Sequence, residues 1–412
     1  MARAKRLLLL VPTTSYRISD FLEAAERLDV DVAVGSDQPQ VLEQYSAGRT
    51  VTLAFKDGDR AVAEIVDYDR DYPLAAIIGV DDETTLIAAM AAKALKLRHN
   101  EPASIAATRN KHHFRTRLAN SGIPAPWFTL APVGDDLTFD VENLPYPVVL
   151  KPLALSASRG VIRADSPTQF AAAVRRISAI LDAADIRGEA ASHILVEEYL
   201  PGDEVALEGL LEDGQLTVLA LFDKPDPLEG PFFEETLYVT PSRLPVQVQN
   251  AIAATVNSAV AALGLRQGPI HAELRINNDG IWLIEVAARS IGGLCSRALH
   301  FGAGGRLEDL ILRHAQGLPA PTVGLDCPAT GVMMIPIPAA GVLRHVAGIE
   351  AARALENIDG VTISIPIGEI LVPVPEGNRY LGFIFASGDT PEAVEAALRA
   401  AHDELEFAIT HD

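Results

Sequence analysis

The chain has 412 residues, too many for one compact core and enough for two or three domains. Its 34 basic and 55 acidic residues give a formal net charge of -21, which repels nucleic acid and anionic membrane surfaces. No local basic patch overrides this charge, and apolar runs such as residues 7–11 are far shorter than the ~20 residues that cross a membrane. We therefore expect no nucleic-acid partner and no membrane association.

The chain start, residues 1–6, is basic and precedes four leucines, but Pro12 ends the apolar run before a signal peptide would be complete. We expect a buried strand there. Cys295 and Cys327 are too few for a disulfide framework and lack the CxxC spacing of a zinc site. These features together predict a cytoplasmic protein.

The first predicted unit, residues 1–103, alternates strands with helices. Its first helix is expected to carry an apolar face made by Ile18, Phe21, Leu22, Ala25 and Leu28. Strands are expected at residues 30–34, 50–54 and 75–80. This pattern is typical of a parallel, Rossmann-like α/β domain. The turn at residues 12–17 contains no glycine, so a dinucleotide-binding GxGxxG fingerprint is absent.

A second unit is predicted at residues 104–317 and a third at 318–412. One helical stretch is expected over residues 104–121, closed by Gly122 and a proline-flanked extended link. Residues 318–322, Leu-Pro-Ala-Pro-Thr, are typical of a linker. The third unit is expected to be α+β. Its predicted strands are residues 362–365 and 380–386, and its helix starts at Thr390-Pro391.

The segment Pro147–Pro152 predicts an apolar strand that ends near Lys151, and a small-residue loop follows at residues 156–161. A buried strand places the lysine ammonium reproducibly, and the loop offers backbone N–H groups to phosphate oxygens. The two features predict a phosphate-binding site. The alternative is a strand-end lysine that reaches solvent beside an ordinary serine-rich turn.

The segment Ile194–Glu204 predicts a strand, a Pro-Gly turn and a second apolar strand, with carboxylates at both ends of the turn. Backbone groups of such a hinge can hydrogen-bond an adenine edge, while Glu204 accepts from ribose hydroxyls. A surface hairpin with solvated acids is the alternative, and the segment by itself favours it.

Glu273 and Glu285 each lie within an apolar strand, and the turn Asn277–Gly280 predicts a hairpin that brings these strands side by side. Burial of two acids requires a compensating cation, so the pair indicates a hard, oxygen-coordinated ion such as Mg²⁺ or Mn²⁺. The alternative is a pair of acids on a solvated sheet face. The apolar flanking residues favour the metal.

Arg289 follows the second of these strands and precedes Gly292 and Gly293. An arginine at this point can bind a substrate carboxylate or stabilise an oxyanion. A structural salt bridge is the alternative.

In this order and spacing, the segments resemble the ATP-grasp superfamily from about Asn110 to His314, with weaker similarity over the flanks. The resemblance implies an ATP-grasp domain of two α+β subdomains that clamp ATP, one of them mobile at about residues 145–202. It also implies a C-terminal lid-like domain. The implied ATP contacts are Lys111, Lys151, Ser156, Ser158, Arg159, Gly160, Glu197, Glu198, Leu200 and Glu204.

Three details of that resemblance concern individual residues. Glu197 is implied to bind the adenine amino group, and Arg159 to assist the phosphates because Ser-Ala-Ser-Arg-Gly replaces a richer glycine pattern. Glu273 and Glu285 occupy the two magnesium-ligand positions. Ala287 replaces the customary asparagine, so water or another side chain completes the metal shell, or the second ion is held less tightly.

The whole-chain layout resembles the L-amino acid ligases that build dipeptides, which also tolerate alanine at position 287 and place an arginine at 289. The resemblance implies an ATP-dependent carboxylate–amine ligase that activates one amino acid as an acyl phosphate, joins it to a second, and releases ADP and phosphate. Implied catalytic residues are Lys151, Arg289, Gly292 and Gly293, with His271 and Arg289 near the substrate. A lone histidine at position 271 either takes the amine proton or is structural. A homodimer is consistent with this group.

Two other functions remain open. The same nucleotide site would support a carboxylase that activates bicarbonate. A nucleotide-binding protein without turnover is supported only by Ala287.

Overall fold

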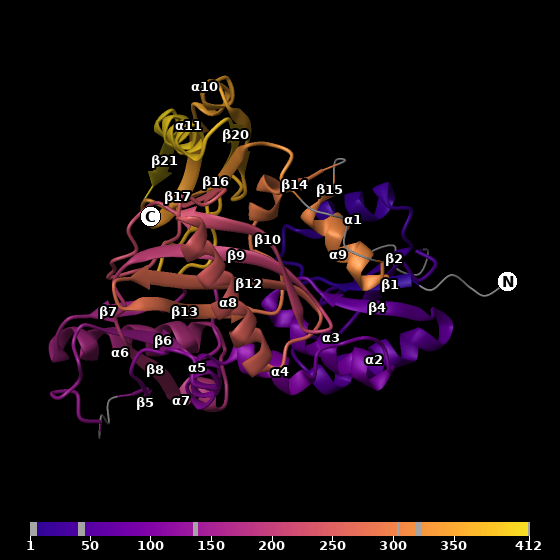
Figure 1. Ribbon diagram of the computed structural model, residues 1–412, viewed down its shortest axis with the longest axis horizontal. Coiled ribbons are helices and arrows are strands. Elements are labelled where there is room, and N and C mark those ends of the chain that lie inside the picture. Colours follow the sequence, from indigo (N-terminus) through magenta and orange to yellow (C-terminus); the bar gives the residue numbers. More distant parts are fainter. Residues whose placement is uncertain (1–5, 40–45, 135–138, 303–304, 319–323, 411–412) are drawn as a thin grey trace.

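The fold is given by a computed structural model that describes residues 6–39, 46–134, 139–302, 305–318 and 324–410. Figure 1 shows an N-terminal unit in indigo beside a large central sheet, with a smaller sheet below and the C-terminal elements above. Among the described residues, no helix combines the length and apolar character that crossing a bilayer requires. The expected α/β and α+β multidomain class is confirmed by this architecture.

The N-terminal unit is a parallel sheet of order β3-β2-β1-β4, as predicted. Its strands are β1 (Arg6–Leu10), β2 (Val32–Ser36), β3 (Thr50–Thr52) and β4 (Leu74–Gly79), and its helices are α1 (Ile18–Arg27), α2 (Gly58–Asp71) and α3 (Asp82–Ala94). Leu22 is 44% exposed, so its assignment to the buried face of α1 is wrong. The buried face that meets α9 (Leu307–Ala315) includes Phe21, Ala24 and Ala25, and each residue turns the helix by about 100°.

The predicted helix over residues 104–121 is wrong, because the structure has two helices, α4 (Pro102–Arg109) and α5 (Lys111–Asn120). Asn110 adopts extended backbone angles between them. Its side chain accepts hydrogen bonds from the N–H groups of His112 (3.0 Å) and His113 (3.1 Å) and thereby caps the second helix. The break places Lys111 at the start of a helix.

The smaller sheet, of order β5-β8-β6-β7, is antiparallel and is covered by a long helix. Its strands are β5 (Phe128–Pro132), β6 (Val148–Pro152), β7 (Ile162–Ala164) and β8 (His193–Glu198), and its helices are α6 (Pro167–Ala183) and α7 (Glu189–Ser192). Apolar side chains of α6, including Phe170 and Ile177, form the core of this subdomain with β6 and β8. We call it the nucleotide subdomain after the role that the resemblance implies.

The central sheet has eight strands in the order β13-β12-β9-β10-β11-β16-β20-β18. Those before residue 318 are β9 (Asp203–Glu212), β10 (Gln215–Lys224), β11 (Leu237–Thr240), β12 (Gly268–Asn277) and β13 (Gly280–Ala287). The others are β16 (Ala329–Ile335), β18 (Ile358–Ile363) and β20 (Gly382–Gly388). Helix α8 (Val246–Leu263) lies against the β9–β13 end in Figure 1, and η2 (Cys295–Ala298) contacts β16 and β20.

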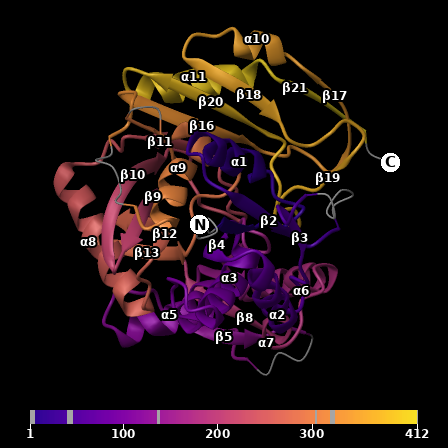
Figure 2. The same ribbon diagram turned by 90° about the vertical axis from the view of Figure 1, so that its right-hand side faces the viewer.

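Part of the C-terminal region continues that sheet, through β16, β18 and β20, and its other strands form a separate three-stranded sheet. The predicted strands and helix are present as β18, β20 and α11 (Pro391–Asp403), which Thr390 caps through its side chain. The remaining elements are α10 (Ile349–Arg353), β14 (His300–Phe301), β15 (Gly305–Arg306), β17 (Gly341–Ala347), β19 (Ile370–Leu371) and β21 (Glu406–Thr410). Figure 2 shows this region arched over the N-terminal unit. The predicted linker 318–322 lies almost entirely outside the described residues, and the unit boundaries stay predictions.

Candidate active site

One cavity between the N-terminal unit, the nucleotide subdomain and the central sheet gathers most of the residues predicted from sequence. Its lining includes Lys111, Lys151, Ser156, Ser158, Glu197, Glu198, Leu200, Glu204, His271, Glu273, Glu285, Arg289, Gly292 and Gly293. Arg159 and Gly160 are not among its lining residues. The topology thus brings together side chains that lie far apart in the sequence.

A cation cluster, defined as Lys111, Arg115, Lys151 and Glu197, lies where α5 meets β6 and β8; all but the buried Arg115 line this cavity. The Lys151 ammonium contacts the Glu197 carboxylate, and Arg115 donates to Glu197 from Nε at 2.7 Å and from Nη2 at 3.3 Å. Burial alone would raise the pKa of Glu197, but the charges of Arg115 and Lys151 outweigh it and lower the pKa to about 2. Two cations therefore contact one buried carboxylate.

Lys111 connects this cluster to the paired strands of the central sheet. Its Nζ donates to the carbonyl of Leu155 at 2.6 Å and lies 3.7 Å from Glu285 Oε2. Burial lowers the pKa of Lys151 despite the opposing charge of Glu197. Both lysines thus line the cavity, and Lys111 contacts the residue just before the loop that the sequence predicted to bind phosphate.

The backbone at the predicted adenine hinge already has partners within the chain. The N–H of Glu198 donates to the carbonyl of Trp127 at 2.9 Å, and the carbonyl of Leu200 accepts from Arg275 at 2.6 Å. The predicted adenine contacts of these two residues stay predictions.

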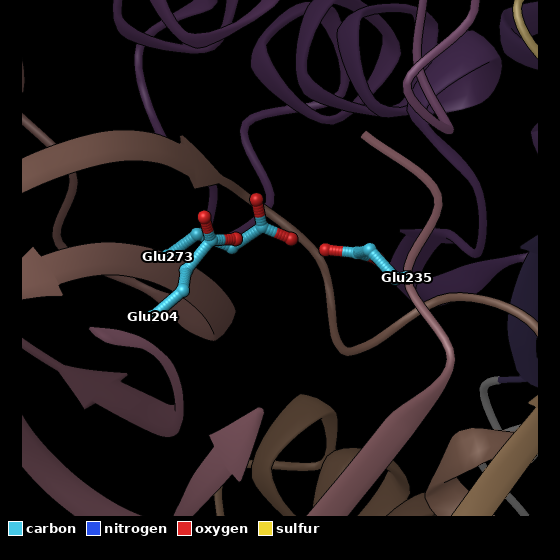
Figure 3. A group of neighbouring side chains, drawn as sticks. All are labelled: Glu204, Glu235 and Glu273. Carbon is cyan, nitrogen blue, oxygen red and sulfur yellow. The ribbon is translucent and has the colours of Figure 1, made fainter. Parts of the chain in front are cut away.

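An acid cluster is defined as Glu204, Glu235, Glu273 and Lys224; its three carboxylates line the same cavity, and Lys224 is buried beside them. Figure 3 shows the three carboxylates converging, with Glu204 and Glu273 on sheet strands and Glu235 on the segment before β11. One ligand oxygen from each lies within 4.8 Å of the others. Lys224 Nζ lies 2.8 Å from Glu204 and 3.3 Å from Glu273, and it also contacts Glu235.

The balance of charge in the acid cluster leaves Glu235 the least neutralised of its carboxylates. Glu204 has a second partner, because Arg275 Nε donates to it at 2.8 Å. Burial and the charge of Glu273 raise the pKa of Glu235 to about 7, against the opposing effect of Lys224. The cluster therefore favours an additional cation beside Glu235.

The predicted hairpin is confirmed, since β12 and β13 are antiparallel and Glu273 is the Cα partner of Glu285. Ala287 is buried and is the strand partner of His271, and its methyl side chain offers no oxygen to a metal. The compact group of oxygens nevertheless joins Glu273 to Glu204 and Glu235 rather than to Glu285.

His271 links the acid cluster to the glycine segment. Its Nδ1 contacts Glu208, its Nε2 lies 3.2 Å from Glu273, and Glu208 accepts from the N–H of Ile291 at 3.0 Å. Burial would lower the pKa of His271, but Glu208 and Glu273 raise it to about 9. At neutral pH such a histidine is a charged imidazolium with both ring nitrogens protonated. It is therefore a poor base for an amine proton, which favours the structural alternative.

Arg289 is held from the N-terminal unit, because Asp82, at the start of α3, accepts from its Nη2 at 2.6 Å. Its Nη1 donates to the carbonyl of Ser290 at 2.9 Å. Gly293 has φ +60, and a Cβ there would lie 2.9 Å from the ring of Phe383, so the close approach requires glycine.

Several residues of the site were not predicted, namely Arg115, Lys224, Glu235, Arg275, Glu208 and Asp82. Arg115 lies one helical turn after Lys111, a spacing that places both on one face. The alternation along β9 places Glu204 and Glu208 on one face. Glu235 had no such signal, because only the packing of the segment before β11 brings it to Glu273.

Comparisons with known proteins agree with this architecture. The ATP-grasp domain family matches residues 144–298, and the ATP-grasp N-terminal domain family matches residues 22–99. The chain belongs to the ATP-grasp superfamily. The L-amino acid ligase C-terminal domain 2 family matches residues 333–410 of this ATP-grasp protein.

Three similar proteins show how far this similarity extends. Alanine–anticapsin ligase of Bacillus subtilis is 26% identical over 288 residues, which cover 65% of this chain and 60% of that protein. The crystal structure of an L-amino acid ligase from Bacillus licheniformis covers 100% of both chains, with TM-score 0.81 and 26% identity. A carboxyaminoimidazole ribonucleotide synthase from Aspergillus clavatus complexed with ATP shares the fold, with TM-score 0.72, 18% identity, and 97% and 98% of the two chains covered.

Proposed function

We propose that this chain is an ATP-dependent carboxylate–amine ligase, whose carboxylate and amine substrates are both amino acids. The observation that carries the proposal is the presence, at one cavity, of both a cation cluster and an acid cluster. The cation cluster suits the negative charge of a triphosphate, and the acid cluster suits the ammonium group of a substrate. The full-length similarity to an L-amino acid ligase supports the same assignment.

In the proposed reaction, Lys111 and Lys151 neutralise the triphosphate while an oxygen of the substrate carboxylate attacks the γ-phosphorus and ADP leaves. The product is an acyl phosphate. The nitrogen of the second substrate then attacks the acyl carbon, phosphate leaves with the bonding electrons, and the nitrogen loses a proton. The ammonium form must lose one proton before its lone pair can attack.

Arg289 is proposed to orient the carboxylate and to stabilise the oxyanion formed when the amine attacks. Its ion pair with Asp82 fixes the guanidinium, and the backbone N–H groups of Gly292 and Gly293 are proposed to assist. A cleft closed over the acyl phosphate would limit its hydrolysis.

Magnesium or manganese is proposed to be held by Glu273 and Glu285, whose carboxylate oxygens are the donors such ions prefer. When bound, the ion supplies positive charge to the phosphate oxygens. Because the side chain of Ala287 offers no donor, Glu235, whose carboxylate oxygen lies within 4.8 Å of that of Glu273, is proposed to complete this set. Its position beside Lys224 suits either that role or the ammonium group of the first substrate.

The same acidic surroundings favour an amino acid over bicarbonate as the activated carboxylate. Bicarbonate has no ammonium group, and a buried carboxylate such as Glu235 would repel it. An amino acid presents both charges, one for Arg289 and one for Glu235.

The test is phosphate release from ATP and Mg²⁺ across a matrix of amino-acid pairs, with bicarbonate as a separate arm and Glu285→Ala as the control. We expect release to require particular pairs and to be lost in the control. Release with bicarbonate alone would assign a carboxylase. ATP binding without release in any arm would assign a nucleotide-binding protein without turnover.

A homodimer and a cytoplasmic location are proposed as well. The free thiols of Cys295, which is buried, and Cys327, which is exposed, suit a reducing compartment. Light scattering at several protein concentrations measures the assembly, and cell fractionation the location.

A further inference from the structure

The loop predicted to bind phosphate has an unfavourable backbone conformation. Ala157 and Ser158 both have φ +54, in the left-handed region that residues with a side chain rarely adopt. Both residues line the cavity. Such a conformation persists only where the surroundings hold it, so the contacts that hold this loop decide its shape.

Two of those contacts come from the C-terminal region. The N–H of Gly160 donates to the carbonyl of Pro375 at 2.8 Å, and Nε of Arg159 donates to the carbonyl of Glu376 at 2.8 Å. These bonds join neighbours of the strained residues to the connection between β19 and β20. They also explain why Arg159 points away from the cavity that the sequence predicted it would line.

A third contact joins the same connection to the helix of the nucleotide subdomain. Arg176 of α6 donates to the two carboxylate oxygens of Glu376 from Nε and Nη2, the latter at 2.9 Å. The Arg176 guanidinium also lies over the ring of Phe232, 4.7 Å from its centroid. Paired hydrogen bonds and a ring contact fix the direction of this side chain more than a single surface ion pair would.

The turn that presents Glu376 has little freedom to change. The N–H of Gly377 donates to the carbonyl of Pro373 at 2.8 Å, and a Cβ on Gly377 would lie 1.8 Å from the carbonyl oxygen of Val372. Only glycine fits so close an approach, and two prolines restrict the backbone before it. The following residues Asn378 and Tyr380 line the cavity, so one segment contacts both the loop and the substrate space.

We propose that the turn at residues 373–377 is a clasp that holds the phosphate loop in its binding shape, with Glu376 as the positioning residue. The clasp joins the nucleotide subdomain to the C-terminal region when the cleft is closed. This inference rests on the proposed function, because it takes the loop at residues 156–160 as the part that meets the phosphates of ATP.

The experiment compares Arg176→Glu, Glu376→Arg and the double swap, in the full-length chain, by calorimetric titration with MgATP. Each single variant is expected to bind MgATP about threefold to tenfold more weakly, and the swap to restore most of the loss. Phosphate release without an amine substrate should rise relative to ligation in the single variants, because an opened cleft admits water.

Arg187→Glu is the matched control, since it makes the same charge change in the same subdomain, on an exposed arginine paired with Asp185. It is expected to bind MgATP like the wild type. Both substituted residues of the clasp are partly exposed, so folding should survive, and thermal melts check this.

The clasp is overturned if the single variants bind MgATP as the wild type does, even where they melt earlier, or if the swap binds no better than the weaker single variant. Failure of the proposed function is a separate result: the wild type would bind MgATP but release no phosphate with any substrate pair. A wild type that does not bind MgATP would overturn both.

Discussion

The cation cluster and the acid cluster are both buried, yet their charge balance is opposite. In the first, Lys151 and Arg115 contact Glu197 while Lys111 lies beside Glu285, and in the second, three glutamates contact Lys224. Isolated buried charge is costly, so each excess is retained where a ligand of the other sign would compensate it. The comparison teaches that one cavity is divided between an anion and a cation.

The largest expected effect comes from removing a cation. Lys151→Met should reduce phosphate release by about 10³-fold, because a preorganised charge on the triphosphate is lost. Steady-state phosphate release measures this. Lys93→Met, which removes an exposed lysine paired with Glu101, should leave the rate unchanged. A loss below tenfold in Lys151→Met would break the assignment of the cation cluster to ATP.

The second effect concerns stability rather than rate. Arg115→Met should lower the free energy of unfolding by about 3 kcal/mol, because Glu197 keeps its burial and loses one of two cationic partners. Urea unfolding followed by circular dichroism measures it. Arg243→Met removes two ion pairs, with Asp223 and Glu395, made by an arginine that is a third exposed, and should cost only about 1 kcal/mol. Equal losses in the two variants would show that burial does not set the cost.

The third effect separates the two clusters by substrate. Glu235→Gln should lower kcat/KM for the amino-acid substrates about a hundredfold while leaving MgATP affinity within a few-fold, because the excess negative charge is removed. Glu234→Gln is the matched control, since this neighbour does not line the cavity. If MgATP binding fell as far as substrate use, Glu235 would act on the nucleotide instead.

The smallest expected effect concerns His314, which lies outside both clusters. It tests whether a buried group that is neutral at pH 7 affects stability differently from the charged groups of the clusters. Burial and the charge of Arg98 lower the pKa of His314 to about 4, and its Nε2 accepts from the N–H of Gly268 at 3.0 Å. Since the folded pKa lies below the unfolded value, its stabilisation is present above about pH 6.5 and is lost as the pH falls toward 4.

We therefore expect the urea midpoint of the wild type to fall between pH 6.5 and pH 4. His314→Gln should show a shallower fall and a cost of about 1 kcal/mol at pH 7.5, because a glutamine oxygen can replace the acceptor. If the urea midpoints of the two proteins changed identically with pH, His314 would not be the cause of the pH dependence.

The sequence was most informative where chemistry followed local periodicity. Lys151 ends an apolar strand, and the turn Asn277–Gly280 sets a hairpin whose register pairs Glu273 with Glu285. Neighbouring residues decide such features, because strand alternation and turn type are local. Helix α5 shows the limit, since a side-chain cap at Asn110 starts a new helix inside the stretch that the sequence predicted to be one helix.

The sequence by itself determined the parallel α/β unit, the paired acids, the two lysines and the resemblance that joins them. Only the tertiary structure decided that Glu235 meets Glu273, that Asp82 holds Arg289, and that Glu376 reaches Arg176 from 200 residues away. These contacts join segments that share no periodicity. Their positions follow from how separate sheets and connections pack, which no local pattern in a single chain encodes.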